Sequence, residues 1–331
     1  MKNRIVYLDR IKGFAILLMV LAHVYMLPLQ MGDSFVFNII GSFHMYLFMF
    51  ISGFVAFIPA SKFNGGGIFG KWKKRFFGYI CPAMMVGWMF ALFGFIILDK
   101  DVNFSSFIGG AWYLKCMAIF CCIQFITIKL KHVWQELLVC AVCYGLFMFG
   151  WKHNDFLNQL MVLEHCTCFF PFYVLGYYAR RYDILEYIKD KNWIYTIAII
   201  GYLCLFFGNI ENHLLMNICD RFIRPTLAII AIVYLFMQRE GQNSKVEKWL
   251  SNIGKQTLDI YIYHGFFILG TLQLNLQYLK DWTVSTNNHV LCLIIATIVS
   301  VLLAYISIFI GKFVRTSDIV RKLVYGQFWE R

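Results

Sequence analysis

Apolar runs of about twenty residues recur along the whole chain, separated by short polar or basic segments. A helix of about twenty residues rises ~30 Å, which is the thickness of the hydrocarbon core of a bilayer. Only 15% of the 331 residues are charged, whereas soluble domains carry about 25%. We therefore expect one all-α integral membrane domain over residues 1–331, a bundle of about ten transmembrane helices at residues 11–30, 34–60, 77–98, 106–128, 133–151, 160–179, 193–209, 222–238, 256–274 and 288–312.

The distribution of Lys and Arg predicts the orientation of these helices. When the N-terminus is placed in the cytoplasm, all but six of the 30 basic residues fall on the cytoplasmic side. Cytoplasmic loops of membrane proteins carry such an excess of basic residues. We therefore expect both termini in the cytoplasm, and we attribute the net charge of +12 to these loops and not to a nucleic-acid site. The six basic residues left for the other side are Lys100, Lys115, Lys152, Arg221, Arg224 and Lys280.

The first two expected spans each contain a histidine near the middle of the membrane. His23 lies ~16–18 Å along its helix from Lys12, and His44 lies ~15 Å along the next helix from Ser34. An ionisable side chain at that depth costs about 2–3 kcal/mol, so it indicates a functional site. The alternative is that each imidazole only bonds a neighbouring helix. Two of them on one helical hairpin favour catalysis, because imidazole is the usual base for removing a hydroxyl proton near neutral pH.

Four further residues are candidates for contacts with a substrate. His264 lies ~13–14 Å along the ninth expected span from its cytoplasmic end, at a depth similar to that of the first two histidines. Taken alone, a histidine in this position more often only bonds a neighbouring helix. Trp112 and Tyr113 open the fourth span, where aromatic rings either form an interfacial belt or stack on a sugar. Glu164, at the outer start of the sixth span, is a candidate for hydrogen bonds to an acceptor.

Basic residues near the expected cytoplasmic face are candidates for binding a cofactor. Arg10 and Lys12 lie at the mouth of the first helix, and Lys74 and Arg75 belong to a basic run before the third. Residues in such positions often only anchor cytoplasmic loops. Clusters of Arg and Lys also bind phosphate well, so the same residues suit the phosphates of an anionic cytoplasmic cofactor.

Two other features have structural interpretations. Ser52-Gly53 indicates close packing between helices more than a serine nucleophile, because small residues let membrane helices approach. The eleven cysteines show no spacing typical of a zinc site, so we expect free thiols and no metal ligand.

Taken in order, the sequence motifs resemble acyltransferase family 3, whose members are ten-helix membrane O-acyltransferases that modify bacterial surface polysaccharides. Within that family, the chain most resembles the fucose-4-O-acetylase-like branch. It departs from the family at Tyr46, where a proline commonly follows the His-Met pair. The motifs are Leu8-Asp9, Lys12-Gly13 leading to His23, Phe43-His44-Met45, Leu47-Phe48, Ser52-Gly53-Phe54, Lys74-Arg75 with Pro82, Trp112-Tyr113-Leu114, Phe172 to Gly176, and Ile260-Tyr261 to His264.

The resemblance implies an O-acetyltransferase of the bacterial cytoplasmic membrane, with acetyl-CoA as donor and a sugar hydroxyl of a surface polysaccharide or lipid-linked sugar as acceptor. It implies a catalytic role for His23, assisted by His44, and an essential role for Lys12 or Arg10, which with Arg75 and Lys74 would bind the CoA phosphates. A homodimer is one possible assembly. Two alternatives stay open: a proton-coupled transporter or flippase that uses the same histidines, and a ligand sensor or scaffold.

Overall fold

The computed structural model describes residues 5–57, 67–98, 110–208, 212–242, 244–273 and 288–328, and none of these residues forms a strand. The chain divides into two compact units, each built from two stretches of sequence. Unit 1 comprises Met1–Phe57 and Phe172–Gly311, and unit 2 comprises Ile58–Pro171 and Lys312–Arg331. The described helices are α1 (Val6–Met26), α2 (Phe35–Gly41), α3 (His44–Ala56), α4 (Gly67–Leu98), α6 (Trp112–Thr127), α7 (Val133–His153), α8 (Asp155–Met161), α9 (Leu163–Arg181), α10 (Ile184–Ile188), α11 (Asn192–Phe207), α12 (His213–Ile218), the π-helix η2 (Cys219–Ile223), α13 (Arg224–Met237), α14 (Lys245–Gly254), α15 (Thr257–Gln273), α17 (His289–Val314) and α18 (Asp318–Tyr325).

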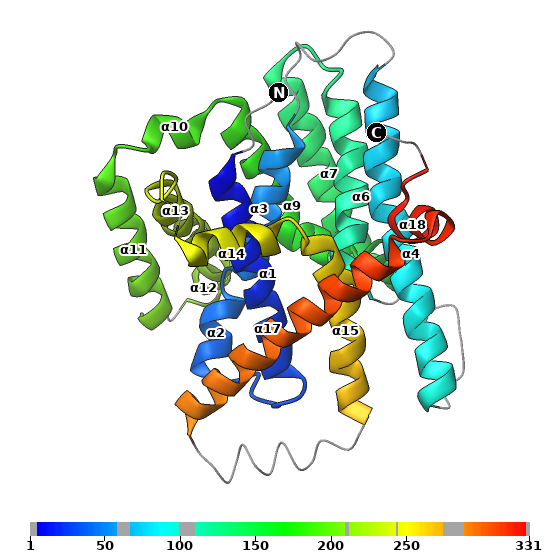
Figure 1. Ribbon diagram of the computed structural model, residues 1–331. Coiled ribbons are helices and arrows are strands. Elements are labelled where there is room, and N and C mark those ends of the chain that lie inside the picture. The colour runs from blue at the N-terminus through cyan, green and yellow to red at the C-terminus, as the bar shows by residue number, and fades with distance from the viewer. Residues whose placement is uncertain are drawn as a thin grey trace. The chain divides into compact units, whose positions relative to one another are not determined.

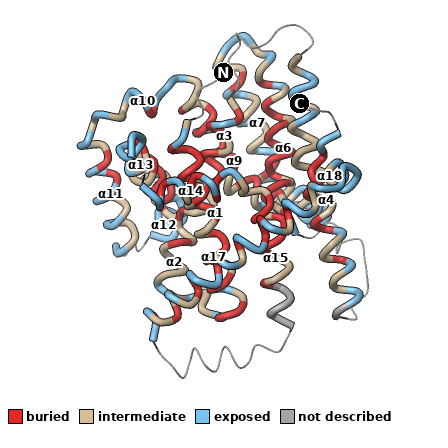
Figure 2. Tube along the Cα trace, viewed as in Figure 1, coloured by how far each residue is buried: buried red, intermediate tan, exposed pale blue. Residues whose placement is uncertain are grey.

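Unit 1 is organised around α1, which packs against α2, α3, α13, α14 and α15 (Figure 1). Most of its side chains are buried, on every side of the helix, as Figure 2 shows by the red colour of this segment. A helix that is apolar all round is typical of the interior of a helical membrane bundle. The charged side chains of Asp9 and Arg10, in its first turns, are buried as well. The helix α1 is therefore the central element on which these five helices of unit 1 pack.

Glycines allow α1 and α14 to cross at backbone contact. A Cβ atom on Gly254 would overlap the carbonyl oxygen of Asp9, and one on Gly13 would overlap the carbonyl oxygen of Leu250. No other residue type fits at either position without moving one helix away from the other. Small residues serve the same purpose in many membrane bundles, where close approach replaces a hydrophobic driving force.

A second crossing of this kind joins α3 to α9. A Cβ on Gly53 would overlap the carbonyl oxygen of Tyr173, and one on Gly176 would overlap that of Phe50. The hydroxyl of Ser52 donates to the Phe48 carbonyl of its own helix, at 2.7 Å. The interpretation of Ser52-Gly53 as a packing motif is therefore confirmed.

Unit 2 is built around α6, which packs against α4, α7 and α8. The C-terminal helix α18 packs on α4, and Gly326, in a left-handed conformation with φ of 63°, lets the chain leave α18 against the backbone of Phe77. Pro82 lies inside the 32-residue helix α4. Gly326 thus ends the last helix where it meets the basic half of α4.

Within the described part of the chain, four helical segments are long and apolar enough to cross a membrane: Phe35–Ala56, Gly67–Ile96, Val133–His153 and His289–Val314. The helices α8 and α9, bent by 50° at Val162, form a fifth if they are one broken span. Other expected spans are not in this set for two reasons. The helix α1 has three charged residues, Asp9, Arg10 and Lys12, near its start, and α6 and α11 are only 16 residues long. The described part of the chain is thus all-helical, with four or five candidate spans, while the ten-span count, the single domain and the cytoplasmic termini stay predictions.

Candidate functional site

Two of the three expected histidines meet in unit 1. His23, on α1, and His264, on α15, place Nδ1 and Nε2 3.1 Å apart, within hydrogen-bonding distance. Their rings are nearly parallel, with centroids 5.2 Å apart and an angle of 14° between the planes. His264 is buried and His23 is half-buried. From the sequence, His264 is expected only to contact a substrate, whereas in the structure it is the direct partner of His23.

The hydrogen bonds define which ring nitrogens carry protons. Nδ1 of His264 lies 2.8 Å from the carbonyl oxygen of Ile260, and because a carbonyl can only accept, this Nδ1 is the donor. Neutral His264 therefore accepts at Nε2, and His23 donates its Nδ1 proton to it. The remaining nitrogen of His23, Nε2, then carries a lone pair. His23 is thus held as a base whose proton-accepting atom is defined by its neighbour.

His44, on a different helix, bonds the carbonyl oxygen four residues earlier through Nδ1, as His264 does. It is the first residue of α3, and its Nδ1 lies 2.7 Å from the carbonyl oxygen of Ile40 in α2. Its Nε2 therefore also carries a lone pair. His44 and His23 lie within electrostatic range of each other, and α1 packs against α3. The chain turns at Ser42-Phe43 just before His44, so α2 and α3 are separate helices even though Tyr46 replaces the family's proline.

The two basic residues at the start of α1 have different surroundings. Arg10 is 1% exposed, and its guanidinium donates to the carbonyl oxygens of Arg239 and Gln242, both at 2.6 Å. Its Nη1 also lies 3.6 Å from the carboxylate of Glu247, which closes the N-terminal capping box of α14. Arg10 therefore ties α1 to the segment between α13 and α14. Lys12 is more exposed and pairs with Asp9 at 3.5 Å, so it is the better placed of the two for an anionic ligand.

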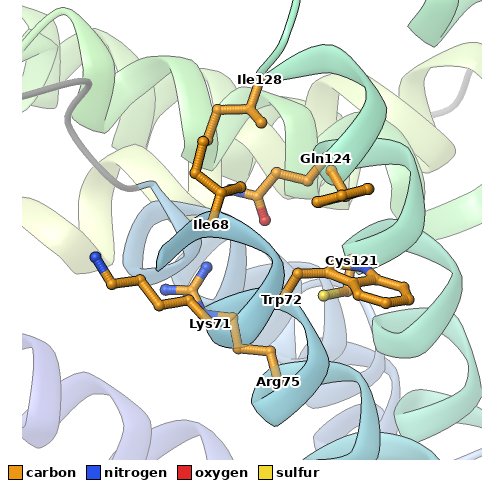
Figure 3. A pocket seen from close by; sticks show the side chains of 8 residues that line it. Ile68, Lys71, Trp72, Arg75, Cys121, Gln124 and Ile128 are labelled. Atoms are coloured by element: carbon orange, nitrogen blue, oxygen red, sulfur yellow. The ribbon is translucent and has the colours of Figure 1, made fainter. Parts of the chain in front are cut away.

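In unit 2, part of the basic run borders a small pocket between α4 and α6. The pocket has a volume of about 30 Å³, and Lys71 and Arg75 supply its positive charge (Figure 3). Trp72 and the amide of Gln124 also line it. Lys71 and Arg75 are one turn apart, on one face of α4. Of the two phosphate ligands expected on α4, Arg75 lines this pocket and Lys74 does not. Lys71 lines it although it was not predicted as a ligand, and the spacing of four residues between Lys71 and Arg75 is the sequence signal that could have shown it.

The expected substrate contacts at the start of α6 also lie in unit 2. The ring of Trp112 packs on His165 and Phe169, with centroids 4.5 and 5.0 Å apart. Glu164 is exposed and immediately precedes His165, while Tyr113 is buried. Trp112 and His165 thus lie together, Glu164 is the residue before His165 in α9, and Tyr113 belongs to the interior.

Metal ligands were not expected. Among the residues that the structure describes, no three His, Cys, Asp or Glu side chains gather in an arrangement that could hold a metal ion. The eleven cysteines are free thiols.

Comparison with known proteins identifies the family. The family model described as an acyltransferase domain matches residues 5–308, which is nearly the whole chain and includes parts of both units. Neither the comparison with curated proteins nor that with solved structures gives a significant match. With buried histidines on apolar helices and a family model that spans almost its entire length, the chain belongs to acyltransferase family 3.

Proposed function

We propose that this chain is an O-acetyltransferase of the bacterial cytoplasmic membrane. It takes an acetyl group from acetyl-CoA and transfers it to a hydroxyl of a surface polysaccharide or a lipid-linked sugar. Membership of the acyltransferase family supports group transfer, and the apolar helices support a membrane location. The assignments of donor, acceptor and fucose-4-O-acetylase-like branch are part of the proposal. A proton-coupled transporter, the alternative, has no support from the family match.

The observation that carries the proposal is the hydrogen bond between His23 and His264. It leaves the Nε2 lone pair of His23 available to accept a proton, and it gives the imidazolium that forms a stronger, charge-assisted bond through Nδ1. A general base needs this combination of an accessible lone pair and support for the charged form. His264 is then a positioning residue, because it acts through His23.

The transfer step follows from this arrangement. The acceptor hydroxyl loses its proton to Nε2 of His23 while its oxygen attacks the carbonyl carbon of the acetyl thioester. The carbon–sulfur bond breaks, the ester forms, and the proton on His23 passes to the departing CoA thiolate. His44 offers a second Nε2 lone pair, which can accept a hydrogen bond from a neighbouring sugar hydroxyl. All atoms and the proton are accounted for without a metal.

Cationic side chains in each unit suit the phosphates of CoA. In unit 2, Lys71 and Arg75 border a pocket of about 30 Å³. In unit 1, Lys12 is the more exposed cation at the start of α1. Arg10 is already bonded to two carbonyls and a carboxylate, so we assign it to holding α1 in place.

The test uses the full-length protein in lipid nanodiscs with radiolabelled acetyl-CoA. Acceptors are a panel of methyl glycosides and a lipid extract of the bacterial expression host. Release of CoA thiol and label in glycan and in protein are followed for wild type, His23→Ala and His44→Ala. His289→Ala, an exposed histidine at the start of α17, is the matched control.

We expect wild type and His289→Ala to release CoA and label the glycan, and His23→Ala to lose about 10²- to 10⁴-fold in rate, the usual contribution of a general base. Label that stays on wild-type protein would replace direct transfer with an acyl-enzyme route. The proposal is wrong if wild type releases no CoA with any acceptor, or if His23→Ala keeps the wild-type rate.

A further inference from the structure

Unit 2 contains a large apolar groove that the proposed chemistry does not use. Its volume is about 790 Å³, and it is lined by side chains of α4, α6, α7 and α8. This is within the range of ligand sites, roughly 300–1,000 Å³. Met84, Trp88 and Leu146, which line it, are each about half exposed or more. The groove is therefore open along one side, which for a membrane helix bundle faces hydrocarbon.

The groove follows one face of α6. Its residues from this helix recur at the spacing of three and four that marks a single helical face, and they extend over ~16 Å. Small side chains make the hollow: Ala83 of α4, Ala118 and Cys122 of α6, and Cys143 of α7. The shape is that of a trough along a helix, as long as a hydrocarbon chain of about a dozen carbons. The α6 residues that line it are Lys115, Ala118, Ile119, Cys122, Ile123 and Ile126.

A positive charge lies at one end of this trough. Lys115 is the only ionisable side chain other than cysteine among its described lining residues, and it is half-buried. Burial of a lysine in an apolar membrane region is costly, and snorkelling alone does not explain why it borders a groove. Phosphate groups are the common anions of membrane lipids, so charge complementarity favours an anionic lipid headgroup.

Beyond Lys115 the same helix presents an aromatic surface. Trp112 lies three residues earlier on α6, is partly exposed, and packs on His165, which lies within electrostatic range of Lys115. Glu164, beside His165, is exposed and can accept hydrogen bonds from hydroxyls. Along α6 the order is therefore apolar trough, cation, then aromatic ring, and Glu164 of α9 is the sequence neighbour of the histidine that this ring contacts.

We propose that this groove binds a lipid-linked sugar phosphate: the hydrocarbon chain lies in the trough, the phosphate is at Lys115, and the sugar stacks against Trp112 with hydroxyls toward Glu164. The order of the three chemical parts of such a lipid matches the order of the three protein surfaces. The inference rests on the proposed function in one respect, since the bound lipid would be the acetyl acceptor. It narrows the acceptor class from any exported glycan to a membrane-anchored one.

The test measures lipid binding to the full-length protein by native mass spectrometry. The probes are polyprenyl-phosphate-glucose, polyprenyl phosphate, uncharged polyprenol and phosphatidylglycerol, each titrated separately. Cys122→Trp fills the trough, Lys115→Gln removes the charge, and Trp112→Ala removes the stacking surface. Leu138→Trp, on an exposed face of α7 outside the groove, is the control for an added indole.

For wild type we expect the tightest binding for polyprenyl-phosphate-glucose, then polyprenyl phosphate, then polyprenol. Lys115→Gln removes the advantage of phosphate over polyprenol, about fivefold to tenfold. Trp112→Ala removes the advantage of the sugar, and Cys122→Trp weakens all three probes while Leu138→Trp weakens none. If phosphatidylglycerol binds as tightly as the sugar phosphate, or Cys122→Trp changes nothing, the groove holds bulk lipid only and the inference is wrong.

A second readout separates this inference from the proposed function. The bound polyprenyl-phosphate-glucose is incubated with labelled acetyl-CoA in nanodiscs. Selective binding together with label in the lipid supports both proposals. Selective binding without label, while methyl glycosides are also not acetylated, supports the groove and contradicts only the acetyltransferase proposal.

Discussion

The crossing of α1 and α14 gives the sharpest prediction about stability, through the substitution Gly254→Ala. The added Cβ would overlap the Asp9 carbonyl oxygen and lie 2.7 Å from its carbon and 2.9 Å from the Gly13 nitrogen. Ordinary contact between such atoms is about 3.5–4.0 Å, so α14 must move away from α1 by about 1 Å. Neither neighbour is a flexible side chain, and both belong to a helix that is packed on several sides.

The magnitude follows from what that movement disturbs. Overpacking of this kind costs about 1–3 kcal/mol. Moving α14 also stretches the contacts of Arg10 with Glu247 and with the nearby carbonyls, which adds about 1 kcal/mol. The lower backbone entropy of alanine in the unfolded chain returns about 0.5–1 kcal/mol. The net loss in the free energy of unfolding is therefore about 1–3.5 kcal/mol, or a fall in Tm of about 2–14 °C for a chain larger than 150 residues.

The assay is thermal unfolding in nanodiscs, followed by tryptophan fluorescence. Gly145→Ala is the matched control, because a Cβ there meets no atom within 4 Å and the helix α7 is exposed at that point. We expect its Tm to stay the same or rise slightly, since alanine favours helix over glycine. Gly13→Ala should lower Tm as Gly254→Ala does, and the double variant by less than the sum, because both clash at one crossing. A Tm for Gly254→Ala at or above that of wild type would refute this account of the crossing.

Three further predictions concern the site and its support. His264→Ala should lower the rate of acetyl transfer about 10- to 100-fold without changing KM for acetyl-CoA. His264→Gln should keep more of the rate, because its amide oxygen can accept the hydrogen bond from His23 Nδ1. Equal losses of rate for the two variants in steady-state kinetics would argue against the proposed hydrogen bond. Lys71→Ala and Arg75→Ala should each raise KM for acetyl-CoA about tenfold, and Lys74→Ala should raise it less. These increases in KM should shrink at high salt. If Lys74→Ala raises KM the most, the α4–α6 pocket is excluded as the phosphate site. Glu247→Ala should lower the free energy of unfolding by about 3 kcal/mol, because buried Arg10 loses its carboxylate partner. Glu247→Gln should lower this free energy by less. Unchanged Tm values for both variants would show that the ion pair is dispensable.

The sequence predicts helices well, because they follow from local pattern. Runs of apolar residues mark segments such as Val133–His153. The depth that the spacing from Lys12 gives for His23 stays a prediction. The number of spans is less certain, because a helix such as α6 is apolar but only 16 residues long. Whether such a helix crosses the membrane depends on its neighbours, which local pattern does not specify.

Long-range partners could not be predicted in the same way. Arg10 looks like a phosphate ligand at the mouth of a helix, yet its carbonyl partners are more than 200 residues away in the chain. Lys71 is different, because helical spacing alone places it on the same face of α4 as Arg75. It could therefore have been predicted from the sequence as a second phosphate ligand. The residues that sequence reasoning misplaces are thus those whose surroundings come from distant segments.

Among the three histidines, two have partners set by local structure and one has a partner from a distant segment. His44 and His264 each bond Nδ1 to the carbonyl four residues earlier, Ile40 and Ile260, and this arrangement follows from the geometry of one helix or one turn. His23 is different, because its Nδ1 is bonded to another imidazole from a helix 241 residues later. Hydropathy gives the depth of a residue but not the rotation of its helix, so it could not show which histidine faces which. The distinction matters for chemistry: His44 and His264 each donate to a carbonyl of the same local segment, whereas His23 donates to the imidazole of a distant helix, and this bond strengthens when His23 gains a proton. Of the three, His23 is therefore the one best supported as the base.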